Sequence, residues 1–511
     1  MNQTFALMRL WLPALFILAG GLSARADGDV DTTFLPNVDS TVYGIAMQPD
    51  GKILISGNFS TAGGGNYTNL ARLNADGTAD GNFNPGLSGT IYSVAVQVDG
   101  KILIGGTFSG HITRLNADGT LDTNFTGSAS STIQSFAVQP DGKILVAGFS
   151  SGFERLNADG TADNTFNPQV SGQILGISVQ PDGKILIGGG FTTVAGVSHP
   201  HIARLNADGT ADTNFNASVN GSVGNIVVQP DGKILMAGTF SAVNGATYNL
   251  IARLNVDGTV DTNFTNQSGN ISIISLALQT DGRILIVGGF TTLGGVSHTR
   301  IARLNADGTV DNSIIQDVEG APYGIAMQSD GQVLIGGPFA SVGSDPSFNH
   351  LARLYNSSVS QTLTVPDSTQ VRWLRGGAAP EVSSVTFESS TNNGVSWTAL
   401  GNGSRITGGW QLTGLRMPSS GTVRARGRAS CGYYNASSSL IEQTAPFTSN
   451  APPVLITATL KAGKLVLTWP YGALQAAPGP IGTYTNIPNA VSPFTNNNMS
   501  LPKLFFRVKV Q

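Results

Sequence analysis

The stretch Gln48-Pro49-Asp50-Gly51-Lys52-Ile53-Leu54 decides the fold, because versions of it return seven times along the chain. The Asp-Gly pairs of these turns begin at positions 50, 99, 141, 182, 231, 281 and 330. A second block follows each turn and reads Ala71-Arg72-Leu73-Asn74-Ala75-Asp76-Gly77 in the first unit. The turns are 41 to 50 residues apart. Repeats of this length that consist of short strands are typical of β-propellers with one blade per repeat. We therefore predict an all-β, seven-bladed β-propeller over residues 27–356.

Each unit predicts four antiparallel strands. In the first unit they cover residues 42–48, 52–57, 70–74 and 78–83. The first two are joined by Pro-Asp-Gly, in which Pro presets φ, Asp caps the turn and Gly accepts a positive φ. The second and third units lack one loop, which explains their shorter spacing.

The ends of the array predict how the ring closes. Residues 27–34 read Asp-Gly-Asp-Val-Asp-Thr-Thr-Phe, which matches the fourth strand of a unit, and the seventh unit degenerates after Leu354. We expect the N-terminal strand to complete the last blade, so that no sheet edge at the end of the array stays open.

These residues resemble the delta-60 repeat family of exported bacterial propellers, whose pattern is Q-P-D-G-K-I-L followed by A-R-L-N-x-D-G-x-x-D-x-x-F. The resemblance covers residues 27–356. It implies the propeller fold and export, and it implies no particular chemistry.

The N-terminus reads as a secretory signal peptide over residues 1–26. Arg9 precedes a mostly apolar run, residues 10–22, and Ala24-Arg25-Ala26 is a small-x-small cleavage motif. The run is shorter than the roughly 20 residues that a membrane helix needs. We expect cleavage after Ala26, a mature chain without a membrane span, and a secreted or cell-surface location, with the periplasm as the alternative.

The net charge argues against one class of partner, and the cysteine content excludes one source of stability. Without residues 1–26 the formal net charge is −5, since two arginines are lost from a total of −3. A mildly acidic chain argues against nucleic acid as a partner. The single cysteine, Cys431, allows no intrachain disulfide, so packing must stabilise the fold.

Beyond the repeats the composition changes to a second kind of β structure. Short strands separated by Gly, Asn and Ser predict an immunoglobulin- or fibronectin-like β-sandwich over residues 362–447. A small C-terminal β module is expected over residues 454–511. The sequence leaves open whether these modules act as an anchor, a sorting signal or a spacer.

The recurring polar residues are interpreted as scaffold, and we expect no metal and no cofactor. Asn74 and Asp76 resemble part of a calcium loop, but Arg72 and Phe83 occupy positions that need ligands. The arginine at this position in every unit is expected to pair with an aspartate such as Asp80. His111, His201 and His350 share a repeat position but belong to blades that are not neighbours, which disfavours a zinc site.

Candidate binding residues lie on the loops between blades and between the second and third strands. These loops vary, whereas the turns of the opposite face are nearly identical, and binding residues concentrate on variable loops. Asp39 and Glu319 are the acidic members of one repeat position, near the seam between blades one and seven, and Asp317 is close to Glu319. Carboxylates that lie close together would raise one another's pKa. The candidate aromatic residues are Tyr43, Tyr67, Tyr248 and Phe348.

The leading hypothesis is an exported, non-enzymatic binding or cell-surface protein with a polysaccharide or protein ligand on the variable face. The alternative is a carbohydrate-active enzyme, a hydrolase or lyase, that uses the acids at the seam, because glycosidic chemistry needs paired carboxylates. A purely structural surface protein is the second alternative. The absence of a nucleophile constellation in the sequence favours a non-enzymatic role.

Overall fold

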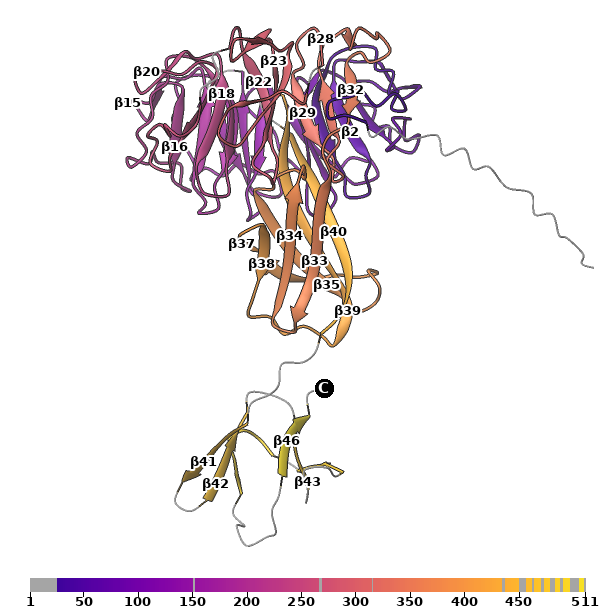
Figure 1. Ribbon diagram of the computed structural model, residues 1–511, viewed down its shortest axis with the longest axis vertical. Coiled ribbons are helices and arrows are strands. Elements are labelled where there is room, and N and C mark those ends of the chain that lie inside the picture. The colour runs from indigo at the N-terminus through magenta and orange to yellow at the C-terminus, as the bar shows by residue number, and fades with distance from the viewer. Residues whose placement is uncertain are drawn as a thin grey trace, which may run out of the picture.

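The computed structural model describes residues 25–149, 152–265, 269–314, 316–433 and 437–449, and parts of residues 456–509. Residues 1–24, which hold most of the expected signal peptide, lie outside this range. The regular elements of the described residues are β-strands (Figure 1). No helix in the described part of the chain is long and apolar enough to span a bilayer.

Seven sets of antiparallel strands among the described residues form the blades of a propeller, which confirms the predicted fold class. In blade one, β1 (Val42–Met47) pairs with β2 (Ile53–Gly57), and β2 pairs with β5 (Leu70–Leu73). The other blades are β6 (Ile91–Val96), β7 (Ile102–Gly106) and β8 (Ile112–Leu115); β9 (Ile133–Val138), β10 (Ile144–Gly148) and β11 (Phe153–Leu156); β12 (Ile174–Val179), β13 (Ile185–Gly189) and β16 (Ile202–Leu205); β17 (Val223–Val228), β18 (Ile234–Gly238) and β21 (Ile251–Leu254); β22 (Ile273–Leu278), β23 (Ile284–Gly288) and β26 (Ile301–Leu304); and β29 (Gly324–Met327), β30 (Val333–Gly336) and β32 (Leu351–Leu354).

The fourth strand of each blade is shorter than predicted. In blade one it is a single bridge between Leu73 and Ala79, and only blade six forms a regular fourth strand, β27 (Val310–Asp311), among the described residues. The cause is the aspartate that follows. The Asp80 amide still bonds to the Arg72 carbonyl, but the Asp80 side chain accepts the Asn82 amide and turns the chain away from the sheet.

The N-terminal segment closes the ring, as predicted. Val30 bridges to Leu354 of β32, and the Asp31 amide donates to the Arg353 carbonyl at 2.8 Å. Arg353 forms an ion pair with the buried Asp31 at 2.7 Å, and its guanidinium lies 4.4 Å from the centre of the Phe34 ring. Residues 28–34 therefore supply the outer strand of blade seven.

The recurring arginine is scaffold, as predicted, and it also joins neighbouring blades. Arg72 Nε pairs with Asp80 at 2.8 Å, and Lys52 pairs with the same carboxylate at 2.5 Å. Arg72 Nη1 donates to the Ala117 carbonyl in the next blade. Arg353 makes the same bond to Ala75, so the link passes from blade seven to blade one.

Two sheets with a shared core follow the propeller. One contains β33 (Val359–Asp367), β34 (Gln370–Gly377), β38 (Gly409–Leu412) and β37 (Ser404–Ile406). The other contains β36 (Thr398–Asn402), β35 (Ser384–Ser390), β39 (Ser420–Tyr433) and β40 (Ser437–Thr448). Trp373 and Phe387 are fully buried between them. That this sandwich follows the immunoglobulin or fibronectin plan stays a prediction.

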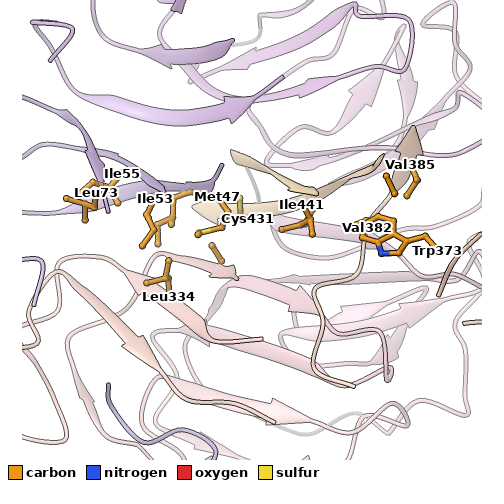
Figure 2. Packing of buried hydrophobic residues seen from close by; sticks show 14 of the residues in the cluster. Met47, Ile53, Ile55, Leu73, Leu334, Trp373, Val382, Val385, Cys431 and Ile441 are labelled. Carbon is orange, nitrogen blue, oxygen red and sulfur yellow. Dashed lines mark hydrogen bonds between the residues drawn. The ribbon is translucent and has the colours of Figure 1, made fainter. Parts of the chain in front are cut away.

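The hairpin β39–β40 extends out of the sandwich and runs up the inside of the propeller (Figure 1). There it pairs with the inner strands of two blades, Ile325 of β29 with Gly432 and Ala95 of β6 with Ser438. The hydrophobic core is continuous from blade one through Cys431 and Ile441 into the sandwich (Figure 2). The hairpin therefore ties the two parts of the chain into one packed unit.

Small inner-strand residues make room for this hairpin. The position four residues before the glutamine of each first turn holds Gly44, Ser93, Ser135, Gly176, Asn225, Ser275 and Gly324. A Cβ at Gly324 would lie 2.9 Å from the Gly432 backbone, which is too close for a larger residue. Ser275 Oγ donates to the Gly432 carbonyl at 2.9 Å.

The C-terminal module has two small sheets in its described residues. They contain β41 (Thr457–Lys461), β42 (Lys464–Thr468) and β45 (Phe494–Asn496), and β44 (Thr485–Asn486), β43 (Ala473–Ala477) and β46 (Phe505–Lys509). Leu467, Trp469 and Leu474 form the buried cluster of this module.

Candidate functional site

The propeller has two chemically different faces, and the sandwich lies against one of them. The Thr280 amide, in a first-hairpin turn, donates to the Ala379 carbonyl at 2.9 Å, and Gln361 Nε2 donates to the Ser329 carbonyl in another such turn. The variable loops lie at the opposite end of the inner strands, on the side away from the sandwich (Figure 1). We call this side the loop face, and it holds every binding residue predicted from the sequence.

Asp39 acts as a local cap on the loop face. Its Oδ1 accepts the Ser60 and Thr61 amides at 2.9 and 3.1 Å, and its Oδ2 accepts the Ser60 hydroxyl at 2.5 Å. Asn220 makes the equivalent bonds in blade five. Burial raises the pKa of Asp39, but the hydrogen bonds from Ser60 and Thr61 outweigh burial and lower the pKa below its usual value. The expected rise of the pKa from a neighbouring acid is therefore wrong for Asp39.

Glu319 and Asp317 are exposed, and both form hydrogen bonds within their own blade. Glu319 lies in β28 (Val318–Glu319), which pairs with β31 (Ser341–Val342), and its Oε2 accepts the Ser341 hydroxyl at 3.2 Å. The Asp317 carbonyl accepts the Gly343 amide. The side-chain bonds of Asp39 and Glu319 thus go to different loops of blades one and seven.

Three of the predicted aromatic residues anchor loops. Tyr67 and Phe348 are buried, 7% and 4% exposed, and Tyr248 packs partly against the core of blade five. All three occupy the repeat position that holds His199 and His298 in blades four and six. Their rings are largely engaged by their own blades, so a ligand could reach little of them.

Tyr43 lies instead in a cluster of aromatic rings at the centre of the loop face. Its ring centre is 5.0 Å from Tyr92, 5.8 Å from Tyr323 and 5.9 Å from Tyr433. Tyr92 also meets Phe149 edge to face at 5.2 Å. We call these five residues the aromatic mouth.

The aromatic mouth is assembled from five segments of the chain. Tyr43, Tyr92 and Tyr323 occupy one repeat position, five residues before the turn glutamine, in blades one, two and seven. Ring closure makes those three blades consecutive. Tyr433 is the last residue of β39, delivered by the threaded hairpin, and Phe149 follows β10.

Four of the five mouth residues were missed from the sequence, although a signal for two of them was present. The equivalent residues in the other four blades are Gln134, Leu175, Gly224 and Ile274, so the tyrosines depart from the repeat average in one sector. Tyr433 could not be found this way, because nothing in its own segment indicates that it enters the propeller.

The tyrosines of the mouth are half-buried, and Phe149 is 46% exposed. Burial raises the pKa of Tyr43, and Tyr92 and Tyr323 raise it further, so the Tyr43 hydroxyl stays protonated at neutral pH. Such a surface offers apolar ring faces beside hydroxyls that donate and accept hydrogen bonds. It suits a sugar ring or a protein side chain, which need both kinds of contact.

The repeated histidines have a structural explanation. His111, His201 and His350 lie in left-handed conformations just before the third strand, with φ between 58° and 67°. Nδ1 of His201 and of His350 lies 3.1 and 3.2 Å from a glycine carbonyl of the same blade. Among the described residues no group of three histidine, cysteine or acidic side chains could hold a metal ion.

Comparison with solved structures gives propellers of low sequence identity. The WD40 propeller domain of Doa1 has a TM-score of 0.47 and 16% identity, and the match covers 64% of this chain and 96% of that chain. A streptogramin B lyase has a TM-score of 0.43 and 15% identity, with 65% and 97% covered. YCF48 bound to a D1 peptide has a TM-score of 0.40 and 15% identity, with 65% and 100% covered.

A comparison with curated proteins found no match. A family model described as a beta-propeller domain of unknown function, DUF5122, matches seven segments of the sequence. They are residues 48–83, 97–125, 139–166, 180–215, 229–264, 279–313 and 328–356. Each segment begins at the glutamine of a first-hairpin turn. Between residues 48 and 356, this chain therefore carries seven DUF5122 beta-propeller repeats.

Proposed function

We propose that this chain is an exported, non-enzymatic binding protein that recognises a polysaccharide or protein ligand through the aromatic mouth. The single observation that carries the proposal is the gathering of Tyr43, Tyr92, Tyr323 and Tyr433 at the centre of the loop face. Buried aromatic anchors supply much of the energy of binding interfaces. Here the rings are held in place and remain partly open.

Rigidity supports this role. Three of the tyrosines lie at the starts of inner strands, and the fourth is the last residue of β39, in a hairpin that is bonded to blades seven and two. Met47 also donates its amide to Ser439 of the same hairpin at 2.9 Å. A site fixed in this way loses little conformational entropy when a ligand binds.

Export is supported by the sequence of residues 1–26 and by the resemblance to the delta-60 repeat family. On this proposal the sandwich has two roles, because it supports the propeller from the turn face and sends Tyr433 to the opposite face. The C-terminal module then serves as a spacer or an attachment to the cell surface.

The test measures binding of the mature chain to immobilised polysaccharides and cell-wall fragments. The same measurement is then repeated with variants of the chain. Tyr92→Ala and Phe149→Ala should each weaken binding about tenfold or more, since each removes a ring from the mouth. Lys52→Ala and Lys143→Ala, in first-hairpin turns, should leave binding unchanged once folding is verified by circular dichroism. The reverse ranking would place the site on the other face.

The same screen separates this proposal from an enzyme. Glu319→Gln should leave binding intact, and incubation with the bound polysaccharide should release no shorter products. Turnover that is lost in Glu319→Gln would instead support the carbohydrate-active alternative.

A further inference from the structure

The second feature with the chemistry of a site lies between the propeller and the sandwich, away from the aromatic mouth. A cavity of about 350 Å³ opens beneath blades two to four. Its lining includes Val98, Pro140 and Pro181 of the propeller turns. Val385 and Trp410 of the sandwich also line it. We call it the waist cleft. Its volume is in the range of small-molecule pockets, and most of these wall residues are apolar.

One positive charge in the waist cleft is not neutralised by an ion pair. Arg114 pairs with Asp122 at 2.7 Å, and Arg426 pairs with Glu442 at 2.7 Å. Arg428 is different, because its Nη1 makes only a long bond of 3.4 Å to the Val96 carbonyl. Within the described residues no carboxylate forms an ion pair with it.

Arg428 is nevertheless charged. Burial lowers the pKa of Arg428 to about 10, partly offset by the negative charge of Asp99. It therefore stays protonated at neutral pH. Asp99 also lines the cleft, but it forms no ion pair with Arg428. A partly buried guanidinium without an ion pair is costly, and a bound anion would remove much of that cost.

Trp410, which lines the cleft, carries a buried hydrogen-bond donor without a partner among the described residues. Trp410 is 4% exposed, and its Nε1 has no hydrogen-bond partner within the described part of the chain. The Arg405 guanidinium covers its ring at 4.3 Å. Gln97 and Gln139 also have unpaired Oε1 atoms here, but the turn glutamines of the other blades share that property, so they do not mark the site.

We propose that the waist cleft binds a small organic carboxylate with an apolar body. The carboxylate would pair with Arg428, whose planar guanidinium suits a bidentate contact. The body would lie among Val98, Pro140 and Val385. One arginine without an ion pair, in a cleft whose wall also holds the acidic Asp99, matches at most a single negative charge, which favours a monocarboxylate over a phosphate dianion. This inference does not rest on the proposed function of the loop face.

The experiment uses the full mature chain and two pairs of probes, phenylacetate with phenylacetamide and 4-methylpentanoate with its amide. Each pair keeps the apolar body and changes the charge. Isothermal titration calorimetry should show saturable binding of at least one acid, with its amide at least tenfold weaker. If neither acid binds at 10 mM, or if acid and amide bind equally, the proposal is wrong.

Variants locate the site. Arg428→Gln should weaken the acid at least tenfold, and Trp410→Phe, which removes only the donor and part of the ring, should weaken it several-fold. Arg416→Gln, an exposed arginine of the same sandwich, should change nothing. Tyr92→Ala should also leave the acid bound, since the mouth lies on the opposite face. Equal binding by wild type and Arg428→Gln would overturn the assignment. If Arg428→Gln does not fold, Trp410→Phe and the comparison of acid with amide decide the question.

Discussion

Replacing Asp31 with asparagine should open the ring where its two ends meet. Asp31 is 2% exposed and receives both Nε and Nη2 of Arg353 on one oxygen, at 2.9 and 2.7 Å. Burial raises the pKa of Asp31, but hydrogen bonds from Thr33, Arg353 and Tyr355 outweigh it and hold the pKa at about 2. Asparagine keeps the shape and removes the charge, so Arg353 is left with no ion pair in this position.

Two estimates bracket the loss of stability. A pKa of about 2 against a usual 3.8 corresponds to about 2.5 kcal/mol, at roughly 1.4 kcal/mol per pKa unit. Breaking a buried ion pair by removing one partner costs about 3–5 kcal/mol. We therefore expect Asp31→Asn to lower the free energy of unfolding by about 2–5 kcal/mol. With an unfolding entropy of about 2 cal/mol/K per residue over roughly 420 residues, the melting temperature falls by roughly 2–6 °C.

Urea denaturation, with hydrogen exchange of the amides of residues 28–34, measures both the size and the place of the effect. Asp50→Asn is the matched control, because Asp50 is exposed and asparagine can still accept the Lys52 amide. The control should stay within about 0.5 kcal/mol of wild type. If Asp31→Asn is as stable as Asp50→Asn and residues 28–34 exchange no faster than in wild type, closure by the N-terminal strand does not stabilise the ring.

Three further predictions concern the scaffold. The hydrogen bond from Lys52 is the main cause that lowers the pKa of Asp80 to about 2. The stability that this pair contributes is therefore complete above pH 3.8 and is lost as the pH falls towards 2. Circular dichroism should show acid unfolding in that pH range, and a fold unchanged at pH 2 would contradict the prediction. EDTA should leave the melting temperature unchanged, since Asp76 Oδ1 is taken by the Thr78 amide and hydroxyl, and a drop of several degrees restored by calcium would refute this. A fragment of residues 27–356, which lacks the hairpin in its interior, should unfold at lower urea than the full chain and bind 8-anilinonaphthalene-1-sulfonate; equal stability would show that the hairpin is dispensable.

The propeller was predictable because each blade repeats the same local information. Pro49, Asp50 and Gly51 specify a turn from their own conformational preferences, and seven copies reinforce one another. Ring closure also followed from sequence, because residues 27–34 carry the pattern of a missing strand. The short fourth strand was not predicted, since it depends on Asp80 turning the chain once it has bonded to arginine and lysine.

The candidate site was much harder to predict. Asp39 differs in charge from Asn220, its repeat equivalent, but makes the same capping hydrogen bonds, so a chemical departure did not mean a functional one. The Glu319 carboxylate accepts the Ser341 hydroxyl of its own blade. Tyr43, Tyr92 and Tyr323 occupy one repeat position, so an alignment of the seven repeats could have found them. Tyr433 joins them only because β39 enters the propeller, and no local pattern within residues 420–433 states which partner that strand finds.

The most direct test of recognition through the loop face is to block each face in turn. Cys431 is buried and its pKa is raised by burial to about 12, so it should not react with maleimide in the folded chain. A single new cysteine can therefore carry a polyethylene glycol maleimide, at Phe149→Cys in the aromatic mouth or at Asp182→Cys in an exposed first-hairpin turn. Polysaccharide binding is measured before and after labelling of each variant. Labelling at position 149 should abolish binding, and labelling at position 182 should leave binding unchanged. The opposite pattern would place the site on the face that carries the first-hairpin turns and contradict recognition through the loop face.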